Sequence, residues 1–121
     1  MRLSKKNNFI LLILYFLIMI FTSIADLSFS PNLWIYSKYV HFLEFLILGF
    51  LLSLYFYDKL DSLFFFIIFF CLVALSAFDE GIQVFSSTRT LTLNDFSINI
   101  LGGFTSLIII YILKKIKNGL F

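Results

Sequence analysis

The chain alternates between long apolar stretches and short polar segments. Apolar residues dominate four ranges, 9–25, 39–57, 62–85 and 96–113, and charged or turn-forming residues separate them. A helix needs about 17–25 mostly apolar residues to cross the hydrocarbon core of a bilayer. The pattern therefore predicts an all-α fold, in which four transmembrane helices form one bundle and one domain over residues 1–121.

The first apolar stretch has a second interpretation, because basic residues also precede the apolar core of a secretory signal peptide. Its apolar run is long for a signal peptide, and no clear small-x-small cleavage site follows it. We therefore expect this stretch to be retained as a true membrane span.

The composition excludes several classes of protein. Hydrophobic residues make up 61% of the chain and charged residues 13%, against roughly 45–50% and about 25% in a soluble domain. Too few polar residues remain to cover a water-facing surface, and the aromatic content of 21% is far from that of a disordered chain. The net charge of +2, without a basic stripe, argues against a nucleic-acid partner. The single cysteine, Cys71, forms no internal disulfide, and its neighbours have no metal-ligand spacing, so we expect no metal and no cofactor.

The distribution of basic residues predicts the orientation of the spans. Short cytoplasmic loops of membrane proteins carry an excess of Lys and Arg. Four spans place the two chain ends and the turn near residue 59 on one side, which then holds seven basic residues against two on the other. Both termini are therefore expected in the cytoplasm. The seven are Arg2, Lys5, Lys6, Lys59, Lys114, Lys115 and Lys117, and the two are Lys38 and Arg89.

Polar residues inside an apolar span are the most informative part of such a chain. An ionisable side chain in a membrane costs roughly 2.5–3.5 kcal/mol on insertion scales and needs a partner or a watery cavity. Here such residues gather at the outer ends of the second, third and fourth spans, which predicts a polar site at the outer face. The candidates are Lys38, His41, Glu44, Asp79, Glu80, Gln83, Arg89, Asp95 and Asn99. The first span offers only Tyr15, Thr22 and Ser23, so we expect it to be a wall.

Several of these residues also have a purely structural interpretation. His41 can simply satisfy a backbone carbonyl, and Asp95 can simply stabilise the start of a helix through the helix dipole. Asp95, Asn99, Gly102 and Ser106 form one stripe of polar and small residues, and Asn99 with Gly102 and Gly103 can simply serve the close packing of helices. Glu44 and Glu80 resist such explanations best, because a buried carboxylate must be either paired or protonated.

The order of these motifs resembles the VanZ-like family of small bacterial membrane proteins. The matching segments are Lys38-Tyr-Val-His41-Phe, Asp79-Glu80-Gly-Ile-Gln83, Arg89, and Asp95-Phe-Ser-Ile-Asn99 followed by Gly102-Gly103. The chain departs from the family pattern at Glu44, where relatives often have an uncharged or aromatic residue. The resemblance implies a multi-pass protein of the bacterial cytoplasmic membrane. One activity associated with the family name is low-level resistance to teicoplanin, a lipid-tailed glycopeptide.

Three functions follow as hypotheses. The first is a protein that acts on, or shields, cell-envelope components at the outer face, with membrane lipids and a lipid-linked envelope precursor or lipoglycopeptide as partners. The second is a membrane enzyme, with His41 and Glu80 as acid and base and Arg89 holding a phosphate or carboxylate. The third is a small proton-coupled transporter, which is disfavoured because the first span carries no charge and the basic residues fix one orientation. A packing partner of larger envelope assemblies remains a fourth alternative.

Overall fold

The computed structural model describes residues 4–24, 34–85 and 92–119. These residues form four long helices, each long and apolar enough to cross a membrane. No strand occurs within these three ranges, so the predicted all-α fold with four spans is confirmed. The helices are α1 (Lys5–Ile24), α2 (Trp34–Tyr55), α3 (Ser62–Gln83) and α4 (Leu93–Lys117), and the 3₁₀ turn η2 (Tyr57–Lys59) joins α2 to α3.

Three helices are longer than the apolar stretches that predicted them. α1 begins at Lys5 rather than at residue 9, α2 begins at Trp34 rather than at residue 39, and α4 continues to Lys117 rather than ending at residue 113. An apolar stretch marks only the part of a helix that lies in hydrocarbon. The helical hydrogen bonds continue beyond it, into segments that carry lysine and other polar side chains.

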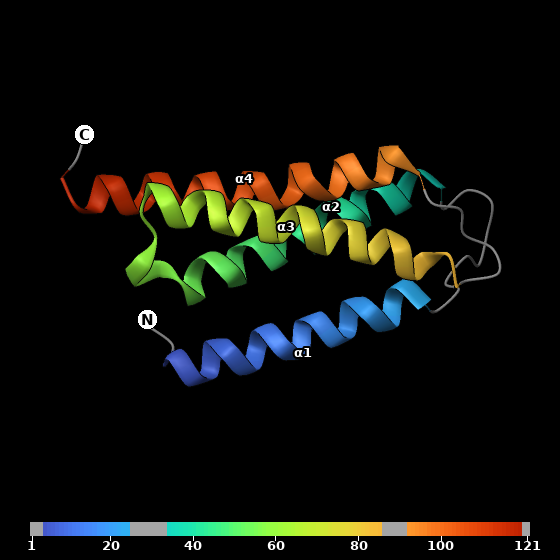
Figure 1. The fold of residues 1–121 in the computed structure, drawn as a ribbon, viewed down its shortest axis with the longest axis horizontal. Helices are drawn as coiled ribbons and strands as arrows, with labels where there is room; N and C mark the ends of the chain where they lie inside the picture. The colour runs from blue at the N-terminus through green and yellow to red at the C-terminus, as the bar shows by residue number, and fades with distance from the viewer. Residues whose placement is uncertain (1–3, 25–33, 86–91, 120–121) are drawn as a thin grey trace.

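Successive helices run in opposite directions along the bundle (Figure 1). The start of α1, the end of α4 and the α2–α3 connection therefore lie at one end, which we call the terminal end. The opposite end, called the polar end below, is formed by the end of α1, the start of α2, the end of α3 and the start of α4. This arrangement agrees with the predicted placement of both termini on one side of the membrane. That this side is the cytoplasmic one stays a prediction.

The closest approach in the bundle is between α2 and α4, which make the most extensive contact of any two helices. Glycines permit it: a Cβ added to Gly102 would collide with the carbonyl oxygen of Phe42, and one added to Gly49 would lie 2.8 Å from the carbonyl oxygen of Gly103. Small residues at a helix interface let backbones come together in a membrane, where apolar burial gives little driving force. Of the predicted stripe, Asn99, Gly102 and Ser106 are accordingly buried, whereas Asp95 is only half-buried.

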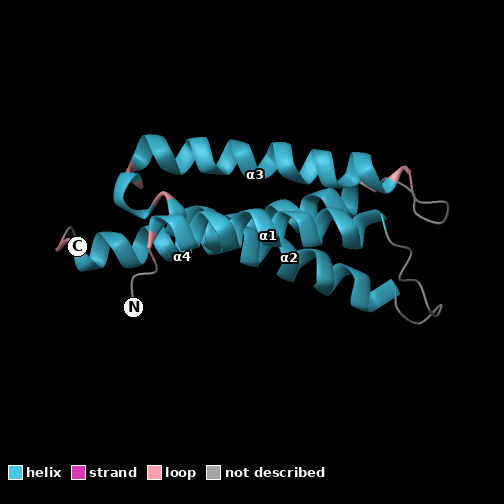
Figure 2. Cartoon of the chain, turned by 90° about the horizontal axis from the view of Figure 1, so that it is seen from below, coloured by secondary structure: helices cyan, strands magenta, loops and turns pink. Residues whose placement is uncertain are grey.

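α3 packs against α4, and α1 lies against α2 and α3 at the edge of the bundle. Figure 2 shows α3 running alongside the other helices over most of their length. The buried core is small and includes Phe45, Leu72 and Leu107. Many large apolar side chains are instead exposed, such as Phe21 and Phe70. An exposed apolar surface of this extent is what a lipid-covered bundle requires.

Polar contacts fix the helix ends at the terminal end of the bundle. The Asp61 carboxylate accepts a hydrogen bond from the backbone N–H of Phe64, at 2.9 Å, and so caps the start of α3. The Lys114 ammonium donates to three backbone carbonyls of the α2–α3 connection, those of Tyr57, Asp58 and Leu60, at 2.6, 3.1 and 2.9 Å. The connection is thereby tied to the last turns of α4.

Candidate functional site

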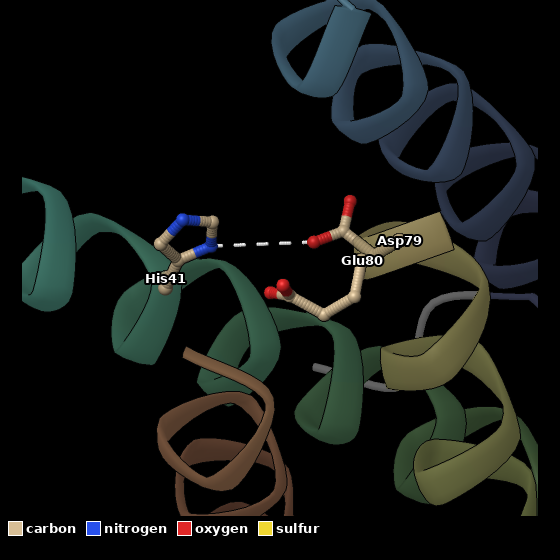
Figure 3. A group of neighbouring side chains, drawn as sticks. All are labelled: His41, Asp79 and Glu80. Carbon is tan, nitrogen blue, oxygen red and sulfur yellow. Dashed lines mark ion pairs between the residues drawn. The ribbon is translucent and has the colours of Figure 1, made fainter. Parts of the chain in front are cut away.

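Polar side chains from three helices meet at the polar end of the bundle. The polar cluster consists of six residues: His41 and Glu44 on α2, Asp79, Glu80 and Gln83 on α3, and Asn99 on α4. All except Glu44 are buried. Figure 3 shows His41 pointing from α2 toward Asp79 and Glu80 on α3. The structure thus brings together six of the nine candidates that the sequence indicated.

Asp79 lies at the centre of the hydrogen bonds in this cluster. It is 5% exposed, and its carboxylate accepts hydrogen bonds from the Ser23 hydroxyl, from Gln83 Nε2 at 3.1 Å and from Asn99 Nδ2 at 3.5 Å. His41 Nδ1 lies 4.0 Å from Asp79 Oδ2, which is an electrostatic contact but too long for a hydrogen bond. Among the described residues, the donors that touch this carboxylate are neutral groups.

Glu80 faces the start of α4. One carboxylate oxygen lies 3.5 Å from Asn99 Nδ2, and the other lies 3.5 Å from the backbone N–H of Thr92. Thr92 itself caps α4, because its hydroxyl accepts a hydrogen bond from the N–H of Asp95 at 3.1 Å. This cap also places a backbone donor beside a second buried carboxylate.

The first span is not the passive wall that we predicted from the sequence. Ser23 donates to Asp79, and the Thr22 hydroxyl lies 3.1 Å from Glu44 Oε1. The Tyr15 hydroxyl donates to the backbone carbonyl of Glu44 at 2.9 Å. The prediction was wrong because it gave these three hydroxyls no role in the site. The hydroxyls of Thr22 and Ser23, in the last turn of α1, contact carboxylates on α2 and α3 without placing a further charge in the membrane.

Two further candidates, Lys38 and Asp95, are described by the structure but are not among the six residues of the polar cluster. Lys38 is half-buried on α2, one turn before His41. Asp95 lies in the first turn of α4, and no hydrogen bond or ion pair from its carboxylate to another described residue is present. Its position favours the simpler interpretation, that its charge stabilises the start of a helix. Arg89 lies outside the described residues.

The arrangement offers two kinds of chemistry. One nitrogen of His41 and one oxygen from each of Asp79 and Glu80 lie within 4.8 Å of one another, which is close enough for the three to bind one cation. An imidazole beside buried carboxylates also suits proton transfer between the groups. The sequence already indicates His41 and Glu80 as acid and base, but no local spacing indicates a cation site, because the histidine and the carboxylates lie on different helices.

The fold and the site together define a small multi-pass membrane protein with a buried polar cluster at one end of its bundle. The chain belongs to the VanZ/LLP1 family, whose profile matches residues 2–114. The family that the sequence motifs resembled is thereby confirmed, and the match extends across all four helices. No curated protein and no solved structure gives a significant match to the chain.

Proposed function

We propose that this protein acts at the outer face of the bacterial cytoplasmic membrane, where it binds or shields cell-envelope components and lowers susceptibility to teicoplanin. The observation that carries the proposal is the placement of buried carboxylates. Asp79 and Glu80 are 5% and 2% exposed at the end of the bundle opposite the chain termini. Buried ionisable groups in a membrane are costly and mark functional sites.

The expected orientation of the helices determines which side of the membrane the polar cluster faces. The excess of basic residues at the terminal end favours a cytoplasmic location for that end, so the polar cluster would lie toward the outer leaflet. Lipid-linked precursors and lipid-tailed glycopeptides both present polar groups at that depth. A cluster of hydrogen-bond donors and acceptors beside an exposed apolar surface suits a ligand that is itself amphipathic.

Antibiotic susceptibility tests this proposal. A sensitive Gram-positive host would express the wild-type chain, Glu80→Gln or Asp58→Asn, with membrane levels matched by immunoblot. Asp58 is an exposed carboxylate at the terminal end and pairs with Lys5 at 3.5 Å, so its substitution removes the same charge outside the site. We expect protection against teicoplanin with the wild type and with Asp58→Asn, and its loss with Glu80→Gln. A well-expressed wild type that protects against neither teicoplanin nor vancomycin would refute the antibiotic part of the proposal.

The second candidate is a membrane enzyme acting on a lipid-linked substrate. It is favoured by one observation: ligand atoms of His41, Asp79 and Glu80 lie within 4.8 Å of one another, which allows proton transfer through a group bound between them. His41 and Glu80 would then serve as acid and base. Comparison of envelope lipids between a deletion strain and its complemented parent tests this candidate. Identical lipid profiles in the two strains would count against an enzyme.

A further inference from the structure

The polar cluster contains residue types that commonly bind metal ions in proteins. Imidazole nitrogens and carboxylate oxygens are the ligands of zinc and manganese in proteins. His41, Asp79 and Glu80 each offer one ligand atom, all three residues are buried, and the three atoms lie within 4.8 Å of one another. Figure 3 shows the side chains directed toward a common space between α2 and α3.

The spacing suits an ion bound between these groups better than direct contacts. His41 Nδ1 lies 4.0 Å from Asp79 Oδ2 and 3.9 Å from Glu44 Oε2, both beyond hydrogen-bond distance. Two ligands that each lie about 2.0–2.2 Å from a tetrahedral metal ion are roughly 3.4 Å apart. Small rotations of the side chains would therefore bring the ligand atoms to coordination distance, without any movement of the helices.

Asn99 provides an independent observation, because one of its buried polar atoms has no hydrogen-bond partner among the described residues. Its side chain is 0% exposed, and its amide points at both Asp79 and Glu80. The nitrogen donates to the two carboxylates, while Oδ1 has no hydrogen-bond partner among the described residues. A buried amide oxygen without a partner is costly. Rotation of the amide about its last torsion angle exchanges the two atoms and presents Oδ1 to the space between the carboxylates, where an ion would satisfy it.

Two neighbouring contacts match the way metal ligands are held in known sites. Gln83 donates to Asp79 at 3.1 Å, and the Ser23 hydroxyl donates to the other oxygen of the same carboxylate. Outer hydrogen bonds of this kind orient a ligating carboxylate and are part of a metal site. Asp79 therefore keeps one orientation before any ion binds.

We propose that His41, Asp79 and Glu80 bind a divalent transition-metal ion inside the polar end of the bundle, with the Asn99 amide oxygen as a further ligand. This departs from the sequence-based expectation of no metal. A mixed set of one nitrogen and several oxygens favours zinc or manganese over magnesium, which prefers oxygen ligands and keeps its water. The site goes beyond the proposed envelope function and does not depend on it.

Metal titration of the purified full chain tests the proposal. The protein in detergent is stripped with a chelator, and Zn²⁺ binding is then measured by calorimetry, with Co²⁺ as a spectroscopic probe. All samples carry Cys71→Ser, because the native thiol on α3 is exposed and is itself a zinc ligand. We expect about one equivalent of saturable Zn²⁺ binding and a visible Co²⁺ absorption band.

Two substitutions inside the site and one outside decide the assignment. His41→Gln and Glu80→Gln each remove a ligand at nearly constant volume, and each is expected to weaken binding at least about tenfold. Asp58→Asn removes an exposed carboxylate at the other end of the bundle and should leave binding unchanged. Circular dichroism identifies a variant that fails to fold, and the remaining variant and the wild-type Co²⁺ spectrum then decide. The proposal is overturned if the folded wild type shows no saturable binding, or if folded His41→Gln or Glu80→Gln binds as tightly as Asp58→Asn.

Discussion

Substitution of Gly102 by alanine tests the close approach of α2 and α4 on which the fold depends. A Cβ at this position would collide with the carbonyl oxygen of Phe42 and would lie 3.1 Å from its carbonyl carbon and 3.2 Å from the backbone nitrogen of Leu46. All three atoms belong to the backbone of α2, so no side chain can rotate away to make room. The helices themselves must separate.

The size of the effect follows from two opposing contributions. Alanine is a better helix former than glycine by roughly 1 kcal/mol, which stabilises α4 itself. Overpacking in a well-packed interior costs about 1–3 kcal/mol, and a rigid backbone places this case at the upper end of that range. Gly81 on α3 provides a matched control, because a Cβ there meets nothing within 4 Å. Gly81→Ala should therefore be neutral or stabilising by roughly 0.5–1 kcal/mol, and the two variants should differ by about 2 kcal/mol or more.

The measurement is reversible unfolding in mixed detergent micelles, followed by circular dichroism. We expect Gly102→Ala to unfold at lower denaturing-detergent fraction than the wild type and Gly81→Ala at an equal or higher fraction. Equal stability of the two alanine variants would refute the reasoning, because the same chemical change would then have the same effect in a crowded and in an open position.

Three further predictions concern other parts of the molecule. Lys114→Met removes donors to three carbonyls and should lower stability by about 1–3 kcal/mol in the same unfolding assay, whereas Lys117→Met, at an exposed position, should not. Ser23→Ala leaves a buried carboxylate with one donor fewer and should lower stability by about 1–3 kcal/mol without loss of helix; unchanged stability would mean that α1 is not held by this bond. In a background without the native cysteine, a cysteine at position 84 should react with an impermeant maleimide in intact cells, and one at position 59 should react only after the membrane is opened. The reverse pattern would contradict the predicted orientation.

The fold was largely predictable from the sequence, because the length of an apolar stretch reflects the thickness of the bilayer rather than the details of helix packing. Four apolar stretches of sufficient length leave few alternatives to four helices. The helix ends were less predictable. The apolar residues mark the part inside hydrocarbon, and α2 begins at Trp34, well before the apolar stretch that starts near residue 39.

The candidate site was predictable in part, because polar side chains are costly to bury in a membrane and are therefore rare within apolar spans. Asp79, Glu80, Gln83 and Asn99 stand out as polar residues inside apolar spans, and they do meet in the structure. Which of them face one another depends on how helices far apart in the sequence rotate and pack. No local spacing contains that information, so the approach of His41 to the carboxylates had to come from the structure.

The position of α1 shows why the polar cluster and the fold are coupled. Met19 and Ser23 are the buried residues of this helix, and both lie in its last turns, toward the polar end. Apolar contacts add little to helix association in lipid, because lipid tails are as apolar as the side chains they replace. The hydrogen bonds from Tyr15, Thr22 and Ser23 therefore contribute much of the attraction between α1 and the helices α2 and α3. Because Ser23 bonds to one oxygen of the Asp79 carboxylate, α1 is held in the bundle by a contact to the polar cluster itself, and loss of that carboxylate would weaken the packing of α1 as well as the cluster.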